Sequence, residues 1–176
     1  MSNKLIKNIL SDLRVELSDE FDRNFERKAF FDRPWPKRKR DVRGSLLMNS
    51  GRLRRSLRCS TDATSLKWTS DTPYAGIHNG GGEITITPRM RKFFWAMYYK
   101  SIGDLSYNRK TKKVAVGKRN NKLTADALFW RGLALTKKSK ITMPQRQFIG
   151  YHNHVGEAID KVMKKNIETF LKDIKA

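Results

Sequence analysis

The chain has 176 residues with four Trp, nine Phe and five Tyr, and 38% of its residues are hydrophobic. This is the length of one domain that buries roughly 70% of its unfolded surface, and the apolar content excludes a fully disordered protein. Lys and Arg number 38 against 17 Asp and Glu, a net charge of +21, so nucleic acid, a membrane surface or an acidic protein is the expected kind of partner.

An amphipathic helix is predicted at the N-terminus. Apolar side chains recur there at steps of three and four residues, which places them on one helical face, and they are Ile6, Ile9, Leu10, Leu13, Leu17, Phe21 and Phe25. Pro34 and Pro36 end the helix, and the four cations that follow repel one another. We therefore interpret residues 33–50 as a basic loop.

Short strands are predicted in the middle of the chain. The imperfect alternation from Leu53 to Cys59, turn residues at 61–65 and a second run from Leu66 to Thr69 indicate a β-hairpin. Residues 74–78 fit one helical turn, and the Asn-Gly-Gly-Gly sequence after it permits positive φ. Another alternating strand is expected at residues 83–87.

Two more helices are expected around a polar segment. The aromatic-rich run from Met90 to Ile102 contains no helix breaker, and a second helix is predicted from Leu123 to Leu135. Residues 106–121 between them are basic and predict an exposed loop or arm, with a short strand at Val114 and Val116.

The chain ends in an extended segment and a helix. Apolar residues surround Pro144, and a long amphipathic stripe begins at Val155. The predicted fold is α+β, with an antiparallel sheet of about four strands covered by the N- and C-terminal amphipathic helices. We expect one domain over residues 1–176, with a basic loop at 33–50 and a basic, aromatic helical or loop insertion at 89–140.

The positive charge is concentrated in two blocks. Residues 33–58 carry ten basic and one acidic side chain, and residues 89–140 carry fifteen and two, while the rest is close to neutral. Basic residues interleaved with aromatics are typical of surfaces that neutralise phosphates and stack on bases. The alternative is a core helix followed by a solvated loop, or an oligomer interface.

No catalytic or metal-binding pattern is evident. His152 and His154 stand two apart, but a zinc site needs about four ligands and the sequence offers no others. His78 has no carboxylate pair or nucleophile motif beside it. With a single cysteine and no apolar run near 18 residues, we expect an intracellular protein without a disulfide, metal, cofactor, membrane contact or enzymatic activity.

Several short motifs follow one another in a specific order. Arg33-Pro34-Trp35 comes after the first helix, Leu46-Leu47 and the segment Ser50 to Leu57 come next, Pro73 to Gly81 follow a strand, and Pro144-Gln145-Arg146-Gln147-Phe148-Ile149-Gly150 precedes the last helix. This order resembles the phage virion morphogenesis family, the Mu-like tail-completion proteins of the head–tail neck. Residues 89–140 depart from the pattern.

The resemblance implies a structural role in virion morphogenesis, as a tail-completion or head–tail joining component of the neck. It implies a homo-oligomeric ring, with a hexamer as one option, that contacts other phage neck and tail proteins. The protein would reside in the host cytoplasm during assembly and then in the virion. A free-standing nucleic-acid-binding protein without sequence specificity is the alternative.

Two groups of residues are predicted to make contacts. The motif residues expected at an oligomer or partner interface are Trp35, Arg52, Arg54, Arg55, Tyr74, Ile77, His78 and Phe148. The cations expected to face packaged DNA, without sequence specificity, or acidic protein surfaces are Lys37, Arg38, Lys39, Arg40, Arg109, Lys110, Lys112, Lys113, Lys118 and Arg119. The sequence does not choose between DNA and protein.

Overall fold

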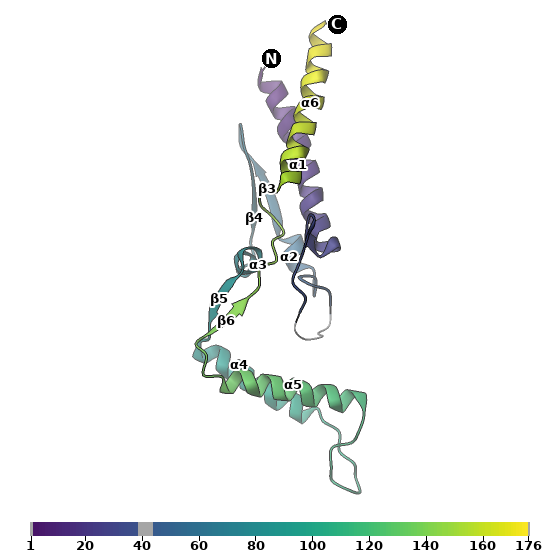
Figure 1. Ribbon diagram of the computed structural model, residues 1–176, viewed down its shortest axis with the longest axis vertical. Coiled ribbons are helices and arrows are strands. Elements are labelled where there is room, and N and C mark those ends of the chain that lie inside the picture. The colour runs from purple at the N-terminus through teal and green to yellow at the C-terminus, as the bar shows by residue number, and fades with distance from the viewer. Residues whose placement is uncertain (1, 39–43, 176) are drawn as a thin grey trace. The chain divides into compact units, whose positions relative to one another are not determined.

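The computed structural model describes residues 2–38 and 44–175 (Figure 1). Its packing divides the chain into two units. Unit 1 comprises Met1–Gly82 and Met143–Ala176, and unit 2 comprises Glu83–Thr142. The segment predicted as an insertion at 89–140 therefore lies entirely within unit 2.

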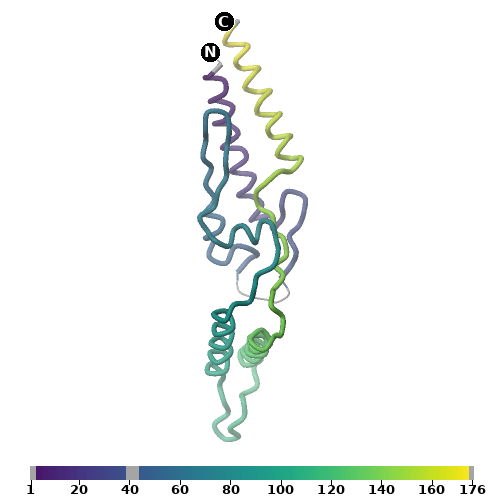
Figure 2. Tube along the Cα trace, turned by 90° about the vertical axis from the view of Figure 1, so that its left-hand side faces the viewer, coloured from purple at the N-terminus to yellow at the C-terminus, as the bar shows by residue number. Residues whose placement is uncertain are grey.

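Unit 1 is built on two long helices, α1 (Ser2–Arg27) and α6 (Asn153–Lys175), which run side by side in opposite directions (Figure 2). The apolar faces predicted from the periodicity meet in one core cluster, to which α1 gives Leu13, Leu17 and Phe21, and α6 gives Val155 and Val162. Burial of such a stripe is the main source of stability of an amphipathic helix.

A β-hairpin packs against α1. Its strands β3 (Leu57–Thr61) and β4 (Leu66–Ser70) pair antiparallel, with Leu57 opposite Ser70 and Thr61 opposite Leu66. The Trp68 ring meets Phe21 edge to face at 5.3 Å between centroids, and its Nε1 donates a hydrogen bond to Ser18 Oγ at 3.2 Å. The predicted hairpin and the covering helix are thus both present.

The predicted sheet of about four strands is wrong. Among the described residues the strands form three separate pairs: β1 (Ala29–Phe30) with β2 (Arg33–Pro34), β3 with β4, and β5 (Gly82–Thr85) with β6 (Lys140–Met143). Two short helices explain the difference. The first residues of the predicted strand at 53–59 form α2 (Arg52–Arg55), and α3 (Ala75–Gly80) intervenes between β4 and β5.

Unit 2 is a helical hairpin of α4 (Pro88–Gly103) and α5 (Lys118–Leu135) with its own core. Thr87 begins α4 by accepting a hydrogen bond from the Met90 amide at 3.2 Å, and Pro88 fits the first helical turn because that turn needs no amide donor there. The rings of Phe94 and Trp130 stack at 6.0 Å between the two helices. A strand at Val114 and Val116 does not form; Val114 makes one isolated bridge to Tyr107.

Candidate interaction site

The segment 144–150 is where several motif segments of unit 1 meet. Phe148 is 0% exposed, and its carbonyl oxygen accepts a hydrogen bond from Nδ2 of Asn24 on α1 at 3.2 Å. The amides of Phe148 and Ile149 both donate to Oδ1 of Asn79 in α3, at 2.9 and 3.1 Å. Hydrogen bonds to two asparagines, the buried Asn24 and the half-buried Asn79, therefore fix this segment to α1 and α3.

Trp35 and Phe148 are core residues of unit 1. Trp35 is 5% exposed, its Nε1 donates to the Gln147 carbonyl at 2.6 Å, and both rings pack on Phe25 at 5.7 and 5.3 Å. The sequence predicted these two side chains at an interface, whereas the structure places both in a core cluster of unit 1. Large rings serve equally well in a core or an interface, and their composition alone does not distinguish the two.

Three other predicted interface residues come together around one cavity, which we call the basic pocket. It has a volume of about 480 Å³ and includes Arg52, Tyr74 and His78 in its lining. Two further arginines, Arg38 and Arg146, bring the number of arginine and histidine side chains in the described lining to four. The remaining lining is largely apolar and includes Leu46, Leu47, Leu53 and Met143.

Arg146 lies deepest in this set, at 7% exposure. Its backbone amide donates to the His78 carbonyl at 2.8 Å and its Nε donates to the Pro36 carbonyl at 3.0 Å. Burial lowers the pKa of the Arg146 guanidinium, and the positive charge of Arg38 lowers this pKa further. The guanidinium nevertheless stays protonated, since arginine does not lose its proton in proteins.

His78 lines the same basic pocket as Arg146. Its ring meets the half-exposed Tyr74 edge to face at 5.9 Å, and its Nδ1 is buried without a hydrogen-bond partner among the described residues. Burial lowers the pKa of His78, and the neighbouring Arg146 lowers it further, so the neutral imidazole is favoured. The pocket therefore combines the Arg146 guanidinium with an unsatisfied ring nitrogen of His78.

The other predicted interface residues make contacts within unit 1. Arg54 donates to the carboxylates of Asp22 and Glu26 on α1, the latter at 2.8 Å, and these hydrogen bonds raise the pKa of Arg54. Arg55 donates from Nη2 to the Ser50 carbonyl at 2.9 Å. Arg54 thus ties α2 to α1, whereas Arg55 closes the turn before α2.

Ile77 and the residues around Gly81 belong to the packing of α3. Ile77 Cδ1 lies only 3.2 Å from where a Cβ on Gly82 would stand. Gly81 adopts φ 69°, and a Cβ there would lie 2.9 Å from the Gln145 amide nitrogen. Glycine at position 81 therefore lets α3 end directly against the segment that carries Arg146.

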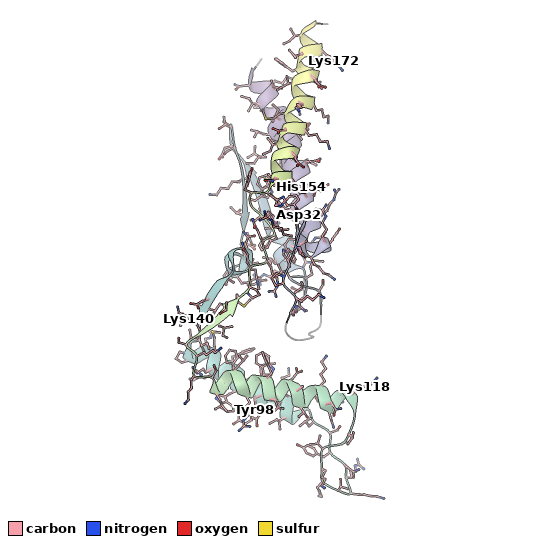
Figure 3. All side chains as sticks on the ribbon, in the orientation of Figure 1. Asp32, Tyr98, Lys118, Lys140, His154 and Lys172 are labelled. Carbon is pink, nitrogen blue, oxygen red and sulfur yellow. The ribbon has the colours of Figure 1, made fainter. Side chains whose placement is uncertain are left out.

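Six of the 15 Lys and Arg of unit 2 lie on the connection between α4 and α5, which we call the basic tip (residues 104–119). Figure 3 labels Lys118 where α5 begins. All six predicted cations of this region are exposed, namely Arg109, Lys110, Lys112, Lys113, Lys118 and Arg119. No acidic residue occurs between Asp104 and Asp126.

An internal hydrogen-bond network holds the basic tip in shape. Asn120, which is 3% exposed, donates to the carbonyls of Ser106 and Ala115 at 2.9 and 2.6 Å, and its Oδ1 accepts from the Ser106 amide at 3.2 Å. Asn108 donates from its amide to the Lys113 carbonyl at 2.8 Å. The cations are therefore displayed on an ordered turn.

The basic loop before α2 is described only in part. Lys37 is exposed, and Arg38 donates from Nη1 to the Gly44 carbonyl at 2.9 Å and from Nη2 to the Ser45 carbonyl. Lys39 and Arg40 lie outside the described residues. Arg38 therefore closes the base of this loop as well as lining the basic pocket.

The paired histidines organise the start of α6. His152 is buried, and its Nδ1 accepts a hydrogen bond from the His154 amide at 3.3 Å while Nε2 faces Asp32 Oδ1 at 2.9 Å. The Phe31 ring stacks on His152 at 4.9 Å. His152 thus caps a helix, and residues 2–38 and 44–175 contain no group of three or more candidate metal ligands.

Two key residues of the site were not singled out from the sequence. Asn24 interrupts the apolar face of α1 between Phe21 and Phe25, and a polar residue on a buried face signals a specific hydrogen bond. Arg146 stands two residues before Phe148 in an extended segment, so the two side chains are expected on the same side of the backbone. The sequence therefore contained a signal for each residue: a polar side chain on an apolar helical face for Asn24, and the two-residue spacing to Phe148 for Arg146.

Exposed charge and exposed apolar surface are features that proteins use in contacts with other macromolecules. Beyond the basic surfaces, α6 exposes Met163, Ile167, Leu171 and Ile174, each at 39–57%. No helix within the described residues is long and apolar enough to cross a membrane.

The chain belongs to the phage virion morphogenesis family, whose model matches residues 7–168. This confirms the resemblance drawn from the order of the motifs and gives the protein a role in the assembly of phage particles. No curated protein and no solved structure matches the chain significantly.

Proposed function

We propose that this protein is a non-enzymatic structural component of the neck, which completes the tail or joins it to the head. The observation that carries the proposal is the family match, which extends over residues 7–168 and so includes both units. Within unit 1, side-chain hydrogen bonds join the motif-bearing segments around Phe148. Such cross-linking is expected of a structural protein that holds its partners in fixed positions.

Genetic complementation tests this role. A phage from which the gene is deleted should accumulate unjoined heads and tails that electron microscopy distinguishes, and the wild-type gene supplied in trans should restore infectious particles. The protein should also be present in purified virions. Normal particles from the deletion phage, or absence of the protein from virions, would contradict the proposal.

The proposal includes a ring of identical copies that contacts other neck and tail proteins. The exposed apolar side chains of α6 support self-association, because monomeric proteins rarely expose a contiguous apolar stripe. Native mass spectrometry of the purified protein should show one closed oligomer, and replacement of Ile167 and Leu171 by Asp should dissociate it. A strictly monomeric wild-type protein at micromolar concentration argues against the ring.

Non-specific nucleic-acid binding is a second candidate function. Its support is unit 2, where 15 Lys and Arg face three Asp and Glu and where the basic tip is held by Asn120. Binding to random-sequence duplex DNA should then weaken steeply with salt, because each phosphate contact releases counterions. Gln at positions 109, 110, 112 and 113 should reduce the slope of log affinity against log salt by about 3–4. An unchanged slope would exclude the basic tip as the contact.

A further inference from the structure

The basic pocket contains a buried positive charge, Arg146, that has no carboxylate partner within the described part of the chain. Apart from the two hydrogen bonds of its backbone amide and Nε, Arg146 has no partner among the described residues, so both η nitrogens remain available. Among residues 2–38 and 44–175, no Asp or Glu lines the pocket. A buried guanidinium is costly unless it is paired, so such an arrangement favours an anion from outside the site.

The second donor of the site is His78. Its Nδ1 has no partner among the residues that the structure describes, although this atom is buried. Either a protonated ring or the Nδ1–H tautomer donates to an anion, so His78 and Arg146 together offer hydrogen bonds to two oxygens. The exposed Arg52 at the rim adds long-range attraction.

The depth and the lining of the pocket define the ligand. A nucleic-acid duplex presents its phosphates on a wide convex surface and does not reach a guanidinium that is only 7% exposed. A carboxylate on a peptide side chain is narrow enough to enter. The apolar wall formed by Leu46, Leu53 and Met143 suits an apolar side chain next to that carboxylate.

We propose that the basic pocket receives an acidic side chain of a partner protein, flanked by an apolar residue, and that Arg146 and His78 bind its carboxylate. This inference rests on the proposed assembly function, since it names the chemistry of one partner. It assigns the acidic-protein contact to unit 1 and leaves the basic tip of unit 2 as a separate surface. Arg146 is then the residue that determines specificity for a carboxylate.

The test uses the full-length protein and the probe peptide Ac-Leu-Asp-Leu-NH2, followed by NMR of the arginine Nε–Hε and histidine ring signals. We expect saturable chemical-shift changes at Arg146 and His78. The control peptide Ac-Leu-Asn-Leu-NH2, which lacks the carboxylate, should bind at least tenfold more weakly. Arg146→Gln should abolish binding and Arg52→Gln should weaken it several-fold. Arg58→Gln removes an exposed arginine outside the pocket and serves as the matched control, with unchanged binding.

Several results would overturn the inference. Equal response to the Asn peptide, or no shift at Arg146 with millimolar peptide, excludes a carboxylate site. If inorganic phosphate or duplex DNA shifts the Arg146 signal at lower concentration than the peptide, the pocket is a phosphate site instead. Peptide binding that appears only after Asp41→Asn, the one acid among residues 39–43, would assign the pocket to an anion of the chain itself.

The experiments distinguish failure of the carboxylate site from failure of the proposed neck function. If Arg146→Gln does not fold, the wild-type signals and Arg52→Gln still decide the question. Peptide binding together with absence of the protein from virions would contradict the proposed function and leave the carboxylate site intact. Virion incorporation that is unaffected by Arg52→Gln, without any peptide binding, would contradict the carboxylate site alone.

Discussion

Replacement of Asn79 by Ala tests whether the motifs of unit 1 are held together by a single side-chain oxygen. Asn79 Oδ1 accepts from the amides of Phe148 and Ile149 at 2.9 and 3.1 Å, so the truncation removes both acceptor contacts at once. Each buried amide without a partner costs about 1–3 kcal/mol. Because Asn79 itself is half-buried and water reaches part of the site, we expect a total loss of about 2–4 kcal/mol.

Urea unfolding followed by circular dichroism measures this loss. With a denaturant slope of about 2 kcal/mol per molar, the midpoint should fall by about 1–2 M. Asn79→Asp is the matched control, because its carboxylate still accepts both hydrogen bonds, and it should stay close to wild type. Hydrogen exchange at the Phe148 and Ile149 amides should accelerate in the Ala variant alone. A loss below about 0.5 kcal/mol, or equal losses for Ala and Asp, would refute the reasoning.

Three further predictions concern the same unit. Phe148→Ala should lower the free energy of unfolding by about 3–5 kcal/mol, measured by heat or urea, because it leaves a cavity at a fully buried position. Phe148→Leu should lower it clearly less. Similar losses for the two variants would argue against tight packing around Phe148. Arg54→Ala should lower the free energy of unfolding by about 1 kcal/mol at low salt, a modest loss because its carboxylate partners are partly exposed. Salt screens an ion pair, so a loss of the same size in 0.5 M salt would contradict an ion-pair origin. Burial lowers the pKa of His78 in the folded protein, so below pH 6.5 the unfolded protein binds a proton there more readily and the free energy of unfolding should fall as pH decreases. The His78→Phe variant should lose less stability than wild type between pH 7.5 and 5.5. Parallel curves of unfolding free energy against pH for the two proteins would exclude His78 as the cause.

The long helices could be predicted from the sequence because their signal is local. The stripe from Leu10 to Phe25 and the run from Met90 to Ile102 each contain enough turns to define a helical period. Strand pairing is a different problem, because partners are chosen between distant segments. β5 pairs with β6, more than fifty residues away, and nothing in the alternation at residues 83–87 indicates that partner.

The candidate site could be predicted only in part. Arg52, Tyr74 and His78 were predicted at an oligomer or partner interface, and the pocket that they line together was not predicted. The residue that gives this pocket its character, Arg146, lies in a segment whose position depends on hydrogen bonds to Asn79 and Trp35. These contacts join parts of the chain about 70 and 110 residues apart, which no local pattern encodes.

The pairing of β5 with β6 also bears on how this chain can change over generations. These two strands carry the chain into and out of unit 2, so its entry and exit are neighbours however many residues lie between them. Loops whose ends are already adjacent tolerate large changes in length, because each doubling costs only about 0.6 kcal/mol. A recombination event that exchanges residues 86–139 would leave unit 1 its own core, so related phages can acquire a new accessory surface in a single inherited step.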